Sequence, residues 1–244
     1  MRQLPDPKKF TQTFPILLAF LSYIMLCACS ATYYSANSQN VPLMREQGDV
    51  KIQGGLAMGD ETEKVEFQAS GAVTDHWALM FNFCHYHDAD NSAGNGNITE
   101  VGAGYYNTLN DKRWIYEAYA GYGLGDGSNR FSSSNTSFKL DRMFVQPNFG
   151  YSLKNFEIVV SLRGAYMNYR DVRQFHSNPE LNYPLYEKGY YVLEPALTLR
   201  GGYKYLKVQL QISHSENLTQ HDFYQDKTHV SAMLYIDLQR SFFK

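Results

Sequence analysis

Cysteine and tryptophan are scarce in this sequence, which holds three of the former and two of the latter among 244 residues. It also lacks an excess of positive charge, because 22 basic residues stand against 24 acidic ones, and no basic surface for nucleic acid is expected. Helical periodicity is hard to find, and beyond residue 28 no apolar run is long enough for a membrane-spanning helix. Tyrosine (20), phenylalanine (15) and glycine (18) are abundant instead. This composition permits a soluble enzyme but fits an all-β chain better.

The N-terminus has the layout of a bacterial lipoprotein signal. Basic side chains precede an apolar run over residues 14–26, which is shorter than a spanning helix. The run ends in Leu26-Cys27-Ala28-Cys29, which resembles the lipobox, where a small residue precedes the cysteine that is lipidated. We therefore predict that residues 1–28 are a signal peptide and that Cys29 carries acyl chains such as palmitate. The alternative is an N-terminal anchor that stays attached.

Cleavage after residue 28 leaves two cysteines, Cys29 and Cys84. A lipidated Cys29 leaves Cys84 alone, and no intramolecular disulfide is expected. We interpret Cys84 as a small buried or lumen-facing residue and not as a nucleophile, because no partner for it is evident. Residues 29–46 are mostly polar without a clear period, and we interpret them as a lipidated tether. Residues 47–244 then form the folded domain.

The folded domain shows the alternation of apolar and polar residues that is typical of β-strands. Strands are predicted over residues 48–58, 63–73, 77–87, 97–108, 114–125, 138–153, 156–170, 188–200, 206–215 and 228–239. Short turns fall at residues 74–76, 109–113, 154–155 and 201–205, and longer or more polar connections at 59–62, 88–96, 126–137, 171–187 and 216–227. Alternating short and long connections are typical of an outer-membrane β-barrel, with turns in the periplasm and loops outside. About ten antiparallel strands, an even number, would place both termini at the periplasmic end.

In a soluble barrel, apolar and polar residues also alternate along each strand, and the apolar face points inward. Three features favour the membrane version. The strands are long, the polar face carries charges of both signs, and Trp77 and Trp114 each follow a short turn on the apolar face. Tryptophan in that position is typical of the aromatic girdle at a membrane interface.

Three stretches resemble a group of small outer-membrane β-barrel lipoproteins of Bacteroidota-type bacteria. They are Asn37-Ser-Gln-Asn-Val-Pro-Leu43, Gly48-Asp49-Val-Lys-Ile and Thr74-Asp75-His76. The resemblance implies the fold and the location, and it supplies no catalytic motif. The residues that follow Cys29 contain no acidic group, so they lack the surface-export signal of lipoproteins from such bacteria. We therefore expect the lipid in the inner leaflet of the outer membrane.

Eight charged residues fall on the predicted inward face of the barrel. They are Lys51, Glu66, Glu100, Glu117, Arg142, Arg163, Glu194 and Arg200. Charges in a narrow interior are costly unless they are paired. We predict that they form a plug of salt bridges, and the alternative is the selective constriction of a pore.

Histidines and acids gather near the predicted outer rim. They are His85, His87, His214, His221 and His229, with Asp88, Asp90, Glu216 and Asp222. Such groups suit metal binding or acid–base catalysis, but outer loops are rich in polar residues in any case. His214-Ser215-Glu216 contains the residue types of a hydrolase triad, yet neighbours along a strand point to opposite faces. We predict no metal site and no catalytic site here.

The sequence therefore predicts an outer-membrane β-barrel lipoprotein with a structural or accessory role in the cell envelope. No cofactor and no catalytic activity are expected, and the expected partners are outer-membrane lipid and other envelope proteins. A hydrolase with a site at the rim and a small selective pore remain the alternatives.

Overall fold

The computed structural model describes residues 32–89, 94–109, 112–131, 134–175, 189–203, 205–220 and 224–238. The predicted signal peptide and Cys29 lie outside this part of the chain. Within it, no helix is long and apolar enough to span a membrane.

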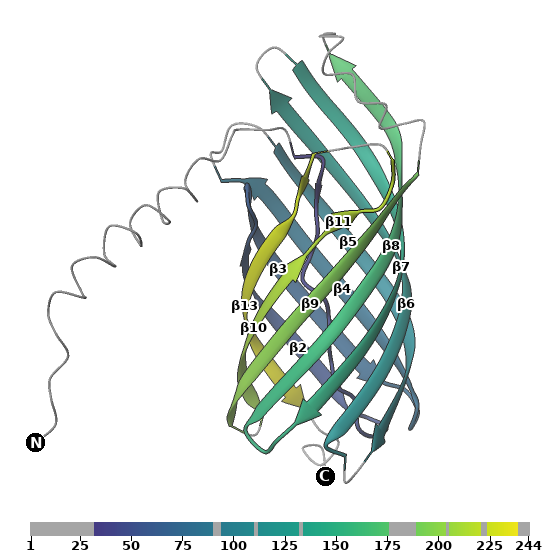
Figure 1. The fold of residues 1–244 in the computed structure, drawn as a ribbon, viewed down its shortest axis with the longest axis vertical. Coiled ribbons are helices and arrows are strands. Elements are labelled where there is room, and N and C mark those ends of the chain that lie inside the picture. Colours follow the sequence, from purple (N-terminus) through teal and green to yellow (C-terminus); the bar gives the residue numbers. More distant parts are fainter. Residues whose placement is uncertain are drawn as a thin grey trace, which may run out of the picture. The chain divides into compact units, whose positions relative to one another are not determined.

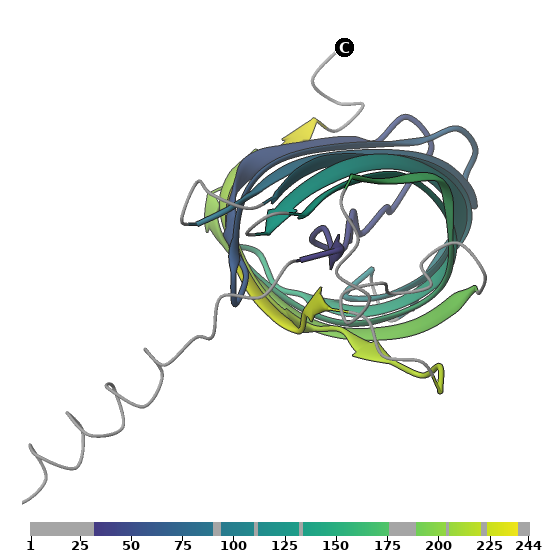
Figure 2. The same cartoon turned by 90° about the horizontal axis from the view of Figure 1, so that it is seen from above.

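Ten long antiparallel strands form a closed barrel (Figures 1 and 2). They are β2 (Val50–Met58), β3 (Thr62–Ala72), β4 (Trp77–Asp88), β5 (Gly94–Leu109), β6 (Trp114–Phe131), β7 (Ser134–Ser152), β8 (Phe156–Phe175), β9 (Tyr190–Tyr203), β10 (Leu206–His214) and β13 (Thr228–Leu238). Neighbours along the chain pair with each other, β10 pairs with β9 and β13, and β13 pairs with β2, which closes the ring. The predicted all-β barrel of about ten antiparallel strands is confirmed.

The two ends of the barrel differ in their connections. We use the name "turn end" for the end of the barrel at which β3 joins β4, β5 joins β6, β7 joins β8 and β9 joins β10. The opposite end is called the "loop end". At the loop end, the predicted connection over residues 126–137 is wrong, because β6 and β7 stay paired from Gly125–Leu140 out to Asn129–Thr136. The sequence there is rich in Gly, Ser and Asn, which suggests a loop. A hairpin that extends into water tolerates such residues because both of its faces can be polar.

Apolar side chains cover the outside of the barrel. On β10, Val208, Leu210 and Ile212 are each at least half exposed, whereas their neighbours along the strand are buried in the interior. Trp77 is exposed at the turn end, where its ring lies edge-on to Tyr105. Trp114 stacks on Phe149 with ring centroids 5.2 Å apart. Both tryptophans therefore lie at the turn end and belong to an aromatic row there.

The segment before β2 lies inside the barrel. Figure 2 shows it in purple, running within the ring of strands, and the side chains of residues 32–44 are all buried. The prediction of a tether over residues 29–46, with a domain boundary at residue 47, is wrong for the described part. Its polar side chains suggested exposure to water, but the interior of this barrel is itself polar and holds them.

The two described ends of the chain lie at opposite ends of the barrel. Leu238 pairs with Val50 at the turn end, as an even number of strands requires. Thr32 lies at the loop end, where its hydroxyl donates to Glu61 of the β2–β3 connection. The prediction that both termini lie at one end does not hold for these residues. The segment runs from the loop end to the turn end before β2 begins, and this adds one crossing to the ten that the strands make.

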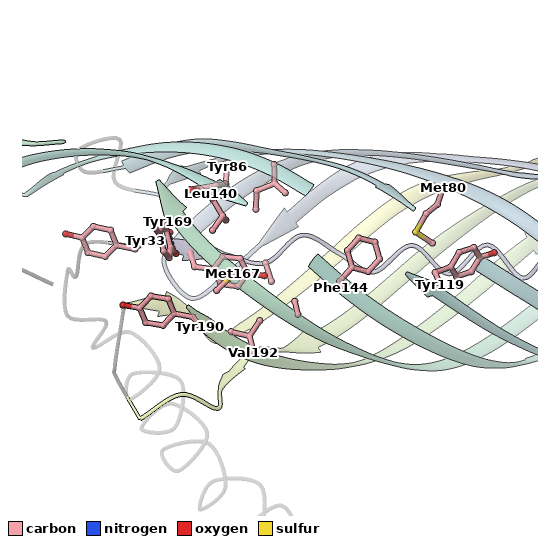
Figure 3. Packing of buried hydrophobic residues seen from close by; sticks show 14 of the residues in the cluster. Tyr33, Met80, Tyr86, Tyr119, Leu140, Phe144, Met167, Tyr169, Tyr190 and Val192 are labelled. Atoms are coloured by element: carbon pink, nitrogen blue, oxygen red, sulfur yellow. Dashed lines mark hydrogen bonds between the residues drawn. The ribbon is translucent and has the colours of Figure 1, made fainter. Parts of the chain in front are cut away.

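Aromatic side chains fill the interior toward the loop end (Figure 3). Tyr33 of the segment packs against Phe138 of β7, and the ring of Phe138 lies edge-on to Tyr169 of β8. Tyr169 in turn lies edge-on to Tyr190 of β9. The segment is thus held by apolar contacts at this level and by polar contacts below it.

Candidate functional site in the barrel interior

The backbone of residues 36–42 is hydrogen-bonded to the barrel wall at every carbonyl. The donors, in order from Ala36 to Pro42, are the side chains of Lys64, Arg163, Gln68, Gln211, Gln146, Arg200 and Tyr235. They come from β3, β7, β8, β9, β10 and β13, all around the ring. Buried carbonyls need partners, and here long side chains replace the neighbouring strand that normally provides them. The segment is therefore part of the folded core.

Amide groups of the same segment donate to inward side chains. Ser38 donates to the carboxylate of Glu66, and Met44 donates to Glu117 over 2.7 Å. The amide of Gln39 donates to the side chain of Gln211, whose own amide group donates to the carbonyl of Gln39. Two of the eight predicted charges, Glu66 and Glu117, thus accept hydrogen bonds from backbone amides of the segment.

Four of the predicted charges meet at the centre of the barrel. Arg142 of β7 donates to Glu100 of β5 over 2.9 Å and to Glu194 of β9 over 2.7 Å. Arg163 of β8 forms ion pairs with the same two carboxylates. All four side chains are about 1 % exposed or less. Two positive and two negative charges therefore neutralise one another across the interior, as burial requires.

Two polar side chains of the segment complete this central cluster. The amide of Asn37 donates to Glu100 over 2.9 Å, and its oxygen accepts from Arg142. The hydroxyl of Tyr34 donates to Glu194 over 2.6 Å. The guanidinium of Arg142 also lies over the ring of Tyr34, 5.5 Å from its centroid. The segment is thus bound through charge-assisted hydrogen bonds, which are the stronger kind.

A second ionic cluster lies toward the turn end. Glu157 of β8 accepts from Arg200 of β9 and Lys207 of β10, each over 2.7 Å. Arg45, at the end of the segment, approaches the same carboxylate to 3.2 Å. Lys51 pairs instead with Asp237 of β13. Arg200 and Lys51 therefore lie apart from the central four residues.

Several interior charges were not among the predicted eight. They are Asp49, Lys64, Glu157, Lys207 and Asp237, all of which are buried. The alternation that placed Glu157, Lys207 and Asp237 on a polar face was a usable signal for them. Tyr34 and Asn37 had no such signal, because a segment without a period gives no face.

The chain makes a sharp bend where it approaches the turn end. Leu43 has a φ of 54°, in the left-handed region that non-glycine residues seldom adopt. Its side chain packs with Val41, Ile115 and Val159 in a small apolar cluster. A Cβ on Gly150 of β7 would lie 2.5 Å from a methyl carbon of Leu43, so a larger residue here would require the side chain of Leu43 to shift.

The described histidines near the loop end do not form one site. His85 and His87 lie on the outward face of β4, with ring centroids 6.4 Å apart, whereas His229 of β13 points inward and bonds to Ser213. His214 approaches Glu216 to 3.4 Å, while Ser215 between them is buried and its hydroxyl donates to Gln225.

Some members of the predicted rim group, Asp90, His221 and Asp222, lie outside the described residues. Among the residues described, no group of three or more His, Cys, Asp or Glu side chains is placed to hold a metal ion. Cys84 is buried in the interior on β4.

The turn end opens into a cavity of about 850 Å³. It is lined by Arg45, Glu46, Asp49, Lys112, Arg113, Ser152, Leu153, Lys154, Tyr205, Lys207 and Asp237. It shares Arg45 and Lys207 with the second ionic cluster. The segment therefore forms part of the wall of this cavity.

Comparisons with known proteins give structural matches alone. No protein-family model and no curated protein sequence matches the chain. One similar solved structure is the N-terminal β-barrel domain of Pseudomonas aeruginosa OprF, with a TM-score of 0.42, 15% identity, and coverage of 80% of this chain and 100% of that one. Another is the translocator domain of the autotransporter NalP from Neisseria meningitidis, with a TM-score of 0.46, 11% identity, and coverage of 79% and 86%. The KdgM porin matches with a TM-score of 0.40, 12% identity, and coverage of 78% and 99%.

Proposed function

We propose that this chain is an outer-membrane β-barrel lipoprotein with a structural or accessory role and no catalytic activity, whose interior is closed to solutes. Its exposed side chains support the membrane. A water-soluble barrel would not expose a continuous outer surface of Val, Leu, Ile and Phe while burying charges inside. The short connections then face the periplasm and the loop end faces outward. Fractionation of cell envelopes tests this, and recovery in the soluble fraction would contradict it.

The lipid anchor is proposed on the lipobox-like motif that ends at Cys29. Metabolic labelling with a fatty acid should mark the wild-type chain and leave Cys29→Ala unlabelled. The matched control is Cys84→Ser, which should keep the label because Cys84 is buried in the barrel. An unlabelled wild-type protein would remove the lipoprotein proposal and leave the barrel untouched.

The closed interior is supported by one observation above all, the hydrogen bonding of seven successive carbonyls, from Ala36 to Pro42, to side chains around the ring. A ten-stranded barrel is narrower than the open porins, and a chain along its axis takes the remaining space. Wild-type protein in planar bilayers should therefore show no ion conductance. Stepwise single-channel currents from pure protein would overturn this and favour the selective pore.

No arrangement in the described residues favours the hydrolase. Its candidate histidines are divided between the outside and the inside of the barrel, where they cannot act on one substrate. Incubation of the pure protein with phospholipid vesicles and unstructured peptides should give no hydrolysis products.

An accessory role implies contacts with other envelope proteins. Cross-linking in intact cells, followed by purification of the barrel, should recover these proteins.

A further inference from the structure

The segment that fills the barrel has its first residues fixed at the loop end. The side-chain amide of Asn129, near the end of β6, donates to the carbonyl of Thr32 over 2.8 Å. The amide of Tyr33 donates to the carbonyl of Tyr224, in the connection between β10 and β13. Residues 34–35 form β1 (Tyr34–Ser35), which pairs in parallel with β12 (Gln225–Asp226) of that connection.

The same segment reaches the turn end by residues 45–48. Arg45 pairs with Glu157 next to the β7–β8 turn, and the amide of Gln47 donates to Asp75 in the β3–β4 turn. The amide of Gly48 donates to the carbonyl of Ala72 at the end of β3. Residues 32–46, if extended, reach at most about 50 Å, which is ample for the roughly 25 Å apolar band of a barrel.

We infer that the chain before Thr32 leaves the barrel on the cell-surface side, and that the acyl chains on Cys29 lie in the outer leaflet of the outer membrane. This rests on the proposed function for the lipid and for the orientation of the barrel. Two residues, Ser30 and Ala31, lie between Cys29 and Thr32, and the three Cα–Cα steps span at most about 11 Å. The lipid therefore cannot be on the periplasmic side while residues 32–46 keep their place.

The rim of the barrel beside Thr32 lies close to the membrane surface, so a lipid attached just before Thr32 can reach the bilayer. Thr32 contacts Glu61, which lies in the short connection between β2 and β3. Glu63 of β3, two residues after Glu61, points outward, and its carboxylate lies 3.8 Å from the ring of His87. Outward-facing charged groups mark the level of lipid headgroups, because they are disfavoured in the hydrocarbon. Thr32 thus lies near the level of the outer headgroups.

This placement differs from the inner-leaflet location expected from the sequence. That expectation came from the missing acidic signal after Cys29 and from termini at the periplasmic end. The structure offers another route to the surface, because the barrel itself encloses the chain that follows the lipid. The acyl chains would then enter the outer leaflet beside the loop end of the barrel.

Surface labelling of single cysteines tests the inference with little change to the protein. In a Cys84→Ser background, Ala31→Cys introduces a thiol next to Thr32, and Asn155→Cys introduces one in the β7–β8 turn. A membrane-impermeant maleimide added to intact cells should label Ala31→Cys and not Asn155→Cys. After permeabilisation both should be labelled. A short epitope inserted between Ala31 and Thr32 gives a second readout with antibody on intact cells.

The outcomes separate the inference from the proposal on which it rests. Fatty-acid labelling at Cys29 together with surface labelling of Ala31→Cys supports both. Fatty-acid labelling with Ala31→Cys reached only after permeabilisation overturns the outer-leaflet location and leaves the lipoprotein standing. No fatty-acid label on the wild type overturns the outer-leaflet lipid and the lipoprotein proposal together. Labelling of Asn155→Cys on intact cells would reverse the orientation and also overturn the inference.

Discussion

Arg142 is the residue on which the central cluster depends. It contacts Glu100 and Glu194 on two other strands and Asn37 on the enclosed segment. Removal of one partner from a buried ion pair leaves the opposite charge without compensation, which is far more costly than loss of a surface pair. Arg142 therefore joins the segment to the barrel wall together with the bonds that Tyr34 and Asn37 make to the two carboxylates.

Arg142→Met should destabilise the folded barrel strongly. We expect a loss of about 3–5 kcal/mol in the free energy of unfolding, because two buried carboxylates lose a donor. Urea unfolding in lipid vesicles, followed by tryptophan fluorescence, measures it. The control is Arg170→Met, whose exposed pair with Asp141 should be worth no more than about 1 kcal/mol. Equal losses in the two variants would show that the central cluster is not sealed from water.

Gly150 tests the close contact between the segment and the wall. Gly150→Ala places a methyl group 2.5 Å from a carbon of Leu43, and overpacking of this kind costs about 1–3 kcal/mol. The same urea unfolding experiment measures the loss. Gly164→Ala on β8 is the matched control, because a Cβ there meets no atom within 4 Å and should leave stability almost unchanged. If Gly150→Ala were as stable as Gly164→Ala, the side chain of Leu43 would not be held tightly against β7.

At the scale of elements, the segment over residues 32–46 behaves as an eleventh crossing of the barrel that belongs to no sheet along most of its length. Its only regular pairing among the described residues is the short parallel contact of β1 with β12. Side chains from the strands take the role of a neighbouring strand. For this reason the segment shows no alternation in sequence, and the polar interior replaces the water that its composition suggested.

A disulfide between the segment and β3 should form without distortion at the loop end. The hydroxyl oxygens of Ser35 and Thr62 are 2.8 Å apart, which is compatible with the short Cβ separation that a disulfide needs. The double variant Ser35→Cys/Thr62→Cys, with Cys84→Ser, should oxidise during export and migrate differently with and without reductant. The control pair Ser35→Cys/Ser152→Cys joins residues at opposite ends and should stay reduced. A disulfide in the control pair alone would reverse the direction of the segment.

At the scale of the whole molecule, the enclosed segment is bonded to strands all around the closed ring. Donors to the segment come from β3, near the start of the barrel, and from β13, its last strand. The segment is therefore bonded to both sides of the seam at which β13 pairs with β2. Its release requires opening of the ring or withdrawal of its whole length.

Replacement of residues 32–46 by a glycine–serine linker of equal length should open the barrel to ions. Six of the eight predicted inward charges form ion pairs within the wall, so the ring should still close. The linker lacks the side chains of Tyr34 and Asn37 that fix the segment to the central cluster, so it should no longer hold one position along the axis. Single-channel recordings should then show currents that the wild type lacks. Heat-dependent migration in gels checks that the variant is folded. A folded variant without conductance would show that the interior is closed without the side chains of the segment.

The alternation of residues determined much of this molecule by itself. Ten strands, their order, the apolar outside and the inward direction of all eight predicted charges follow from a period of two, because each face of a strand meets a single environment. The connection expected at residues 126–137 is instead a paired hairpin, because polar strands outside a membrane have the composition of loops.

What only the tertiary structure decided is how the inward charges are grouped and what lies between them. Arg142 and Arg163 share Glu100 and Glu194, while Glu66 and Glu117 bind backbone amides, since the register and curvature of the closed ring set those distances. The position of residues 32–46 was likewise hidden, because a non-periodic chain takes its partners from whatever surrounds it. A segment that reads as a tether outside becomes the core of the barrel once the ring closes around it.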